Sequence, residues 1–310
     1  MAAHFTLTGV RRLAIAGFAA LLGGVGIAQQ VETVSTMAFL EGPTSDKDGN
    51  VYFVEMVTPR IMKVDKNGVT TMFRDKSNNA NGLVIDAQGR LVACEGAAST
   101  RNGAKIPSNG RITRTDLKTG KIEVLATAYQ GKPLVGPNDV TLDGKGRLYF
   151  TDLGGSAVYR IDPNGTLTQL VANPQVQRPN GIQVSPDDTK LYVADSFPPP
   201  MNYRKIHVFD LKPDGSVANQ RTHYDFGDVR GADGMSIDTQ GNLYASAGSG
   251  ATKNTGIHVI SPAGKLVKIM PIPEDPISNN AFGGPDMKTL YVTAGKTLYK
   301  LQNDIAGMPR

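Results

Sequence analysis

One short frame recurs six times along this chain of 310 residues, and it restricts the possible folds more than any other feature. Each copy opens with an acidic or amide side chain, continues into a short apolar strand and turns five positions later. The opening residues are Glu41, Asn81, Asn138, Asn180, Asp233 and Asn279. Successive copies start between 40 residues (41 to 81) and 57 residues (81 to 138) apart. Periods of about 40–50 residues with four strands each are typical of β-propellers.

The third copy shows the unit most clearly. Its four apolar segments are separated by turn residues such as Asp143–Gly146 and Asp162–Gly165, which favour tight backbone geometry. The expected strands are Val140–Leu142, Leu148–Thr151, Ala157–Ile161 and Thr166–Val171. Almost no helical periodicity follows Glu32, so we predict an all-β chain built from four-stranded antiparallel blades.

The last copy ends at Leu298–Leu301, without room for a full fourth strand. A spare strand, Glu32–Phe39, precedes the first copy. Pairing the two closes the ring and removes an exposed sheet edge. We therefore predict a six-bladed β-propeller that forms a single domain over residues 29–310, closed by an N-terminal strand.

The first 28 residues are typical of an export signal. Arg11 and Arg12 precede the apolar run Leu13–Ile27, and small residues stand where a signal peptidase would cut before Gln29. The run is shorter than the ~20 residues that a membrane-spanning helix needs. We expect cleavage, a periplasmic or secreted protein, and no stable membrane insertion afterwards.

Charge and cysteine content argue against two classes of function. Loss of Arg11 and Arg12 with the signal lowers the formal net charge from +5 to +3, and no basic cluster stands out. Nucleic acid is therefore not an expected partner. The single cysteine, Cys94, lies in the apolar stretch Leu91–Cys94, which predicts a core residue. No second cysteine exists to form an intramolecular disulfide.

In a ring, the six opening side chains would converge at one end of the central channel. Two are acids and four are amides, an oxygen-rich set that suits Ca²⁺ better than Zn²⁺. Asn and Asp before Gly are also ordinary turn residues, which is the simpler interpretation of Asn81 and Asn279. Glu41 is not a favoured turn residue, and with Asp233 it indicates a metal site.

Two further patterns concern the ends of the second strands. Long insertions follow some of them, at 95–111, 196–205 and 247–255, and these loops should surround the same opening of the channel. Asp152 and Asp195 end second strands themselves. We expect these acids to tie blades together through hydrogen bonds, because buried acids need partners.

The order of these motifs resembles the family of gluconolactonase, regucalcin (senescence marker protein) and luciferin-regenerating enzyme, which is related to diisopropylfluorophosphatase. The resemblance covers about residues 32–302. It rests on Glu41–Pro43, Pro137–Asp139, Pro179–Gly181, Asp233–Met235 and Asn279–Gly284. Members are six-bladed propellers with a catalytic divalent metal, usually Ca²⁺, on the axis.

The resemblance implies roles for individual residues. Glu41, Asn180 and Asp233 would be metal ligands with Asn138 as a fourth, and Mg²⁺, Mn²⁺ or Zn²⁺ are possible substitutes for Ca²⁺. The substrate would be a small lactone or related ester, opened by water with metal assistance and with Asp233 as the candidate general base. Asn138 contacts substrate in some members, and Asn81 and Asn279 would either lie behind the metal ligands or contact the substrate. Arg101 and Tyr203, which the resemblance does not cover, are candidate substrate contacts at the rim of the pocket. Leu134–Pro137 contains no Arg of the kind that often meets sugar hydroxyls in this family.

The sequence is also consistent with other functions. The same metal chemistry would serve an organophosphate or phosphotriester hydrolase, and the run Phe197–Met201 favours a less polar substrate. A binding propeller without catalysis would not need Glu41 and Asp233 on the axis. A lyase like strictosidine synthase uses a related propeller.

Overall fold

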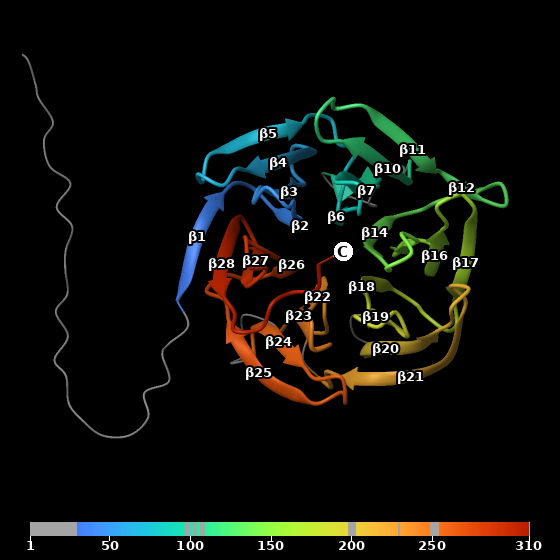
Figure 1. Cartoon of the computed structure of the whole chain (residues 1–310). Coiled ribbons are helices and arrows are strands. Elements are labelled where there is room, and N and C mark those ends of the chain that lie inside the picture. The colour runs from blue at the N-terminus through green and yellow to red at the C-terminus, as the bar shows by residue number, and fades with distance from the viewer. Residues whose placement is uncertain are drawn as a thin grey trace, which may run out of the picture.

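The structure, a computed structural model, describes residues 30–96, 100–101, 104–105, 109–197, 203–228, 230–248 and 254–309. Within these residues the chain forms strands and turns, and six four-stranded antiparallel sheets stand in a ring around a central channel (Figure 1). No helix in the described part is long and apolar enough to cross a membrane. The predicted export signal lies outside the described residues and stays a prediction.

Blades 1 to 3 follow one another in chain order, each with its first strand innermost. Blade 1 consists of β2 (Leu40–Ser45), β3 (Val51–Glu55), β4 (Arg60–Val64) and β5 (Thr70–Arg74). Blade 2 consists of β6 (Leu83–Ile85), β7 (Arg90–Glu95), β10 (Arg111–Asp116) and β11 (Ile122–Ala126). Blade 3 consists of β14 (Pro137–Leu142), β15 (Leu148–Asp152), β16 (Ala157–Ile161) and β17 (Leu167–Ala172).

Blades 4 to 6 complete the ring. Blade 4 consists of β18 (Pro179–Val184), β19 (Lys190–Phe197), β20 (Tyr203–Leu211) and β21 (Val217–Asp225). Blade 5 consists of β22 (Met235–Ile237), β23 (Leu243–Ala247), β24 (Gly256–Ile260) and β25 (Leu266–Pro271). Blade 6 consists of β26 (Ile277–Gly283), β27 (Thr289–Ala294), β28 (Thr297–Gln302) and β1 (Val31–Thr36).

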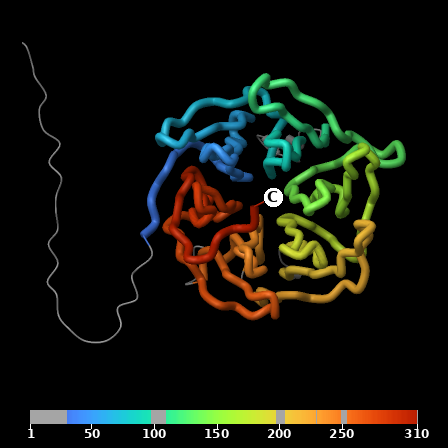
Figure 2. The backbone as a smooth tube through the Cα atoms, viewed as in Figure 1, coloured from blue at the N-terminus to red at the C-terminus, as the bar shows by residue number. Residues whose placement is uncertain are grey.

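The ring closes as the sequence predicts. β1 pairs antiparallel with β28, from Val31 opposite Leu301 to Thr36 opposite Thr297. Figure 2 shows the first described residues alongside the last blade, so the two ends of the propeller meet in one sheet. Two short hairpins lie outside the blades, between blade strands: β8 (Thr100–Arg101) with β9 (Ala104–Lys105), and β12 (Ala128–Tyr129) with β13 (Lys132–Pro133).

Apolar side chains hold the blades to one another. Six clusters of buried residues lie one at each junction between neighbouring blades. At the junction of blades 2 and 3, for example, Ile112 and Val92 share a cluster with Phe150. The second strands β15 and β23 are buried at every position, whereas the outer strand β25 is exposed over its first three residues. Because stability comes from blade-to-blade packing, the inner strand ends can carry polar residues.

Candidate metal and active site

The inner strands approach closely because glycine follows several of the frame residues. Gly42 has a left-handed backbone (φ +45°), and a Cβ there would lie 1.9 Å from the carbonyl oxygen of Asn81. A Cβ on Gly234 would lie within 1.9 Å of the side chain of Asn279. No side chain fits at Gly42, where the neighbour is backbone, and a side chain at Gly234 would displace the Asn279 amide. Both glycines are therefore packing residues of the channel.

Backbone hydrogen bonds link successive inner strands at this level. The Gly82 N–H donates to the carbonyl of Asn138 (2.7 Å), and the Gly181 N–H donates to the carbonyl of Asp233 (2.9 Å). The pairing register also shifts at the frame residues, as between Glu41 and Thr44 in blade 1 and between Pro137 and Val140 in blade 3. Such bulges re-aim side chains and are common next to active sites.

Three carboxylates from three blades influence one another electrostatically at this end of the channel: Glu41, Asp139 and Asp233. Burial raises the pKa of Glu41 well above its usual range, and the charges of Asp233 and Asp139 raise it further. Burial and the charge of Asp233 raise the pKa of Asp139 to about 7. The site therefore holds more negative charge than its surroundings neutralise.

Asp233 accepts hydrogen bonds from two different residues, one on each carboxylate oxygen. Its Oδ1 accepts a hydrogen bond from Asn180 Nδ2 (2.6 Å), and its Oδ2 accepts one from the Arg230 guanidinium (2.6 Å). Burial raises the pKa of Asp233, while Arg230, Asn180 and Arg178 act to lower it. Its side chain stays 20% exposed, against 5% for the residue Glu41.

Asp139 has a partner from the far side of the ring. Asn279 Nδ2 lies 2.9 Å from one carboxylate oxygen of Asp139 and 3.1 Å from the other. Blade 3 and blade 6 face each other across the channel (Figure 1), so this bond spans the axis.

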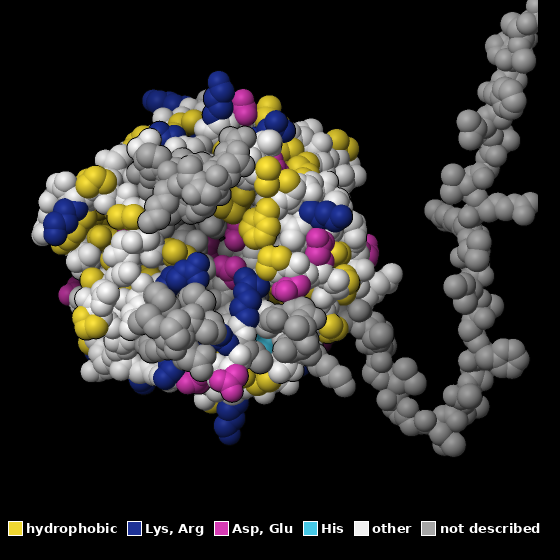
Figure 3. Space-filling model, turned by 180° about the vertical axis from the view of Figure 1, so that it is seen from behind, with side chains coloured by type: hydrophobic (Ala, Val, Ile, Leu, Met, Phe, Trp, Pro, Cys, Tyr) yellow, Lys and Arg dark blue, Asp and Glu magenta, His cyan; other side chains and the backbone are white. Residues whose placement is uncertain are grey.

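Close contacts between successive inner strands bring the predicted residues to one end of the channel: Glu41, Asn138, Asn180 and Asp233, along with Asn81 and Asn279. Asn81 and Asn138 are buried. The side chains of Arg101 and Tyr203 lie outside the described residues, so their predicted substrate contacts stay predictions. Seen from behind, Asp and Glu side chains occupy a hollow near the middle of the molecule, with Lys and Arg side chains beside it (Figure 3).

Sequence reasoning missed two residues of the site. Asp139 occupies the position that is glycine in four other copies of the frame, and this departure from the repeat was a usable signal. Arg230 has no counterpart in the repeat and stands three residues before Asp233. Its guanidinium also lies 3.7 Å from Asp275 and donates to the carbonyl of Ile277 (3.3 Å), which links blade 5 to blade 6.

Acids at the ends of the second strands hold the connections between blades, as predicted. Asp152 accepts hydrogen bonds from the backbone N–H groups of Val135 (2.9 Å) and Gly136 (2.6 Å), just before Asn138. In the next blade Asp195 holds the N–H groups of Gln177 and Arg178, just before Asn180. Those two bonds measure 2.9 Å and 2.7 Å. These acids position amides of the site without lying in it.

The oxygen ligands at this end of the channel fit a hard divalent cation only if the amide oxygens of Asn138 and Asn180 bind it together with the carboxylates. Among the described residues, no three His, Cys, Asp or Glu side chains are grouped closely enough to hold a metal by themselves. Carboxylate and amide oxygens together suit Ca²⁺, and an excess of buried negative charge favours a cation. Asn180 turns its nitrogen to Asp233 here, and a half-turn of the amide would present its oxygen instead.

Fold and site together define a six-bladed propeller with an acidic centre on its axis. Residues 39–296 match the model of the SMP-30/gluconolactonase/LRE-like region, so the chain belongs to that family. It is 28% identical to a gluconolactonase of Zymomonas mobilis over 316 residues, which covers 91% of this chain and 83% of the relative. It is also 28% identical to the lactonase drp35 of Staphylococcus haemolyticus, covering 67% of this chain and 62% of that protein.

Solved structures agree on the architecture. The gluconolactonase of Xanthomonas campestris superposes with a TM-score of 0.74 at 27% identity, over 88% of this chain and 89% of that one. Regucalcin of Agrobacterium tumefaciens, a calcium-binding protein, superposes with a TM-score of 0.71 over 89% of this chain and 93% of that one. At 18% identity, the second likeness concerns the fold alone.

Proposed function

We propose that this protein is a Ca²⁺-dependent lactonase that opens a small lactone by attack of water. The observation that carries the proposal is that three acids from three blades, Glu41, Asp139 and Asp233, lie near enough for their charges to act on one another. The family's relatives include a gluconolactonase and lactonases. Glu41, Asn138, Asn180 and Asp233 are the ligands that would hold the ion. When bound, the ion supplies a Lewis acid that polarises the lactone carbonyl.

Asp233 is the best placed of the acids to move the proton. Its side chain remains 20% exposed. In the proposed reaction, it takes a proton from the water whose oxygen bonds to the carbonyl carbon. The ring C–O bond then breaks, and the proton passes to the departing alkoxide. Arg230 holds one carboxylate oxygen of Asp233, so the base keeps its orientation during the reaction.

A substrate and metal screen tests this function. Purified protein stripped with a chelator would be assayed against sugar lactones, aliphatic lactones and organophosphate triesters, with Ca²⁺, Mg²⁺, Mn²⁺ or Zn²⁺ added back. We expect lactone hydrolysis that the chelator abolishes and Ca²⁺ restores. Hydrolysis of the triesters alone would establish the phosphotriesterase instead, and activity unaffected by chelation would rule out the metal mechanism. Asp233→Asn with Ca²⁺ bound and full turnover would exclude the base role.

The positioning of Asn180 by Asp195 gives a separate prediction. Asp195→Ala leaves the N–H groups of Gln177 and Arg178 without their acceptor. We expect a loss of about 1–3 kcal/mol in the free energy of unfolding, since two backbone donors lose a buried acceptor. Ca²⁺ affinity should fall as well, because the backbone before Asn180 is released. Urea unfolding and calorimetric titration with Ca²⁺ measure the two effects, and Asp187→Ala, an exposed acid of the same blade, is the control.

A further inference from the structure

The hydrogen bond between Asn279 and Asp139 joins opposite blades across the channel. The two residues are 140 positions apart in the chain, and both are buried. The bond depends on Gly234, because any larger residue there would occupy the space through which the Asn279 side chain passes. The conformation of the Asn279 side chain in blade 6 therefore depends on Gly234 in blade 5 as well as on its own strand.

The amide of Asn279 is held in one orientation. Its Oδ1 accepts a hydrogen bond from the backbone N–H of Asn280 (2.8 Å), which leaves Nδ2 to face the Asp139 carboxylate. With its oxygen already engaged, Asn279 acts as a hydrogen-bond donor toward the acids rather than as a metal ligand.

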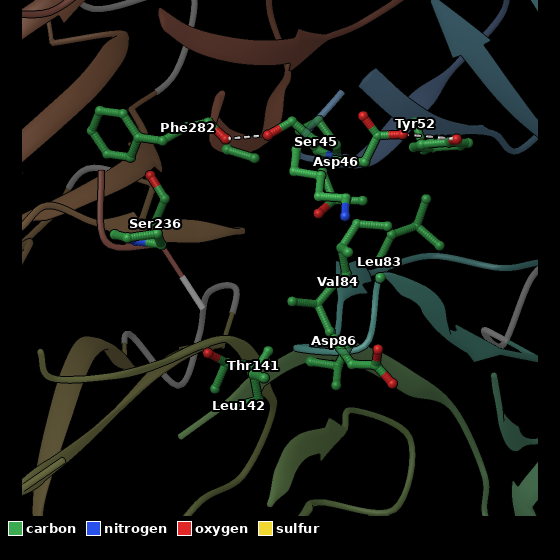
Figure 4. A pocket seen from close by; sticks show the side chains of 18 of the residues that line it. Ser45, Asp46, Tyr52, Leu83, Val84, Asp86, Thr141, Leu142, Ser236 and Phe282 are labelled. Carbon is green, nitrogen blue, oxygen red and sulfur yellow. Dashed lines mark hydrogen bonds between the residues drawn. The ribbon is translucent and has the colours of Figure 1, made fainter. Parts of the chain in front are cut away.

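A cavity of about 840 Å³ lies in the channel on the other side of this bond. Figure 4 shows its wall, to which Ser45, Val84, Thr141, Ser236 and Phe282 contribute from five blades. Asp139 and Asn279 belong to the lining, but Glu41, Asn180 and Asp233 do not.

The C-terminal segment also borders the cavity. Met308 and Pro309 are part of its lining, and Figure 1 shows the chain ending at the centre of the ring. The bond between Asn279 and Asp139 therefore forms a floor between the acidic centre and a cavity of mixed polar and apolar lining.

We propose that Asn279 is a positioning residue that acts through Asp139, and that their bond closes the metal centre against this cavity. The inference rests on the proposed metal centre. Asn279 fixes both oxygens of Asp139, so that carboxylate presents a constant direction to the bound cation. Partners of this kind change metal affinity or activity by about 10–100-fold when they are removed.

A double-mutant cycle with Ca²⁺ alone tests the inference. Calorimetric titration would compare the wild type, Asn279→Ala, Asp139→Ala and the double variant. We expect Asn279→Ala to weaken Ca²⁺ binding about tenfold or more. In the Asp139→Ala background, the same change should alter the affinity by less than about twofold, because a residue that acts only through Asp139 has nothing left to position. Equal losses in both backgrounds would overturn the inference.

Two further measurements separate a positioning role from others. Europium luminescence lifetimes in H₂O and D₂O report the water bound to the ion, and opening the floor should increase that water in Asn279→Ala. At saturating Ca²⁺, the variant should lower kcat more than it raises KM. A raised KM with unchanged Ca²⁺ affinity would instead assign Asn279 to substrate binding and would overturn the positioning role.

Variants at neighbouring positions control for misfolding. Asn280→Ala removes an amide of similar burial in the same strand, one that bonds to Tyr244 and Ser246 rather than to an acid. It should alter stability without the change in Ca²⁺ affinity. Gly234→Ala displaces Asn279 without changing its chemistry and should reproduce the effect of Asn279→Ala. A wild-type protein that binds Ca²⁺ but opens no lactone would refute the proposed function and leave this cycle fully informative.

Discussion

Glu41→Gln is expected to lower Ca²⁺-dependent lactone hydrolysis at least about 100-fold while making the metal-free protein more stable. The activity falls because one of two charged ligands becomes a neutral amide. The stability rises because Glu41 is buried beside Asp233 and Asp139, and no cation in the metal-free site matches their combined charge. A buried charge without sufficient partners costs about 1–3 kcal/mol or more. Activity assays and urea unfolding in chelator measure the two effects.

The direction of the pH dependence follows from the raised pKa of Glu41. A carboxyl that binds its proton more tightly in the folded state stabilises the fold at low pH, and this contribution is lost as the pH rises through the raised pKa. The gain from Glu41→Gln should therefore be absent near pH 4 and present at pH 8. Glu123→Gln, at an exposed ion pair with Arg114, is the control. Equal stability of Glu41→Gln and wild type at pH 8 would contradict the unfavourable charge at Glu41.

The fold could be predicted because the repeat is visible in the residues that set backbone geometry. Turns such as Asp143–Gly146 fix where each strand ends. The short apolar segments between the turns can then pair in only one order within a blade, each with the next along the chain. The missing fourth strand of the last copy and the spare segment Glu32–Phe39 then specified the closure. β1 does pair with β28, as expected.

The site was predictable only in part, because its residues follow different rules. Glu41 and Asp233 stand at repeated positions, so alignment of the copies found them. Asp139 stands where Gly42 and Gly181 stand in their copies, and its carboxylate reaches the axis because a bulge turns the strand there. Arg230 belongs to a connection between blades, and no repeat constrains such a segment.

The bond between Asn279 and Asp139 shows what a pattern cannot supply. A ring of six blades places blade 3 opposite blade 6, so the two strands could be predicted to face each other. Which end of the amide faces the acid depends on the N–H of Asn280, and this in turn depends on the local backbone. The orientation of a single side-chain amide is therefore set by its local hydrogen bonds and packing, which a sequence pattern does not contain.

A buried ionic network at the junction of blades 1 and 2 leads to the largest expected loss of stability. Glu95 ends the second strand of blade 2, and its side chain is fully buried. It is paired with Arg74 at the end of β5 and with Arg111 of β10 (2.7 Å). Thr113 donates its hydroxyl to the same carboxylate. Glu95 thus ties blade 1 to blade 2, the role that the sequence assigned to Asp152 and Asp195.

Glu95→Gln is expected to lower the free energy of unfolding by about 3–5 kcal/mol, because it leaves the buried guanidinium of Arg74 without a counter-charge. The desolvation of Arg74, more than the lost attraction, accounts for this cost. The double variant Arg74→Met with Glu95→Leu should therefore be more stable than Glu95→Leu alone, since no buried charge remains. Urea unfolding of the wild type, Arg74→Met, Glu95→Leu and the double variant measures the coupling, and additive losses would show that the two charges do not depend on each other. Ca²⁺ affinity should stay near that of the wild type wherever the fold persists, because the network has no hydrogen bond to Glu41, Asp139 or Asp233 among the contacts of the described residues.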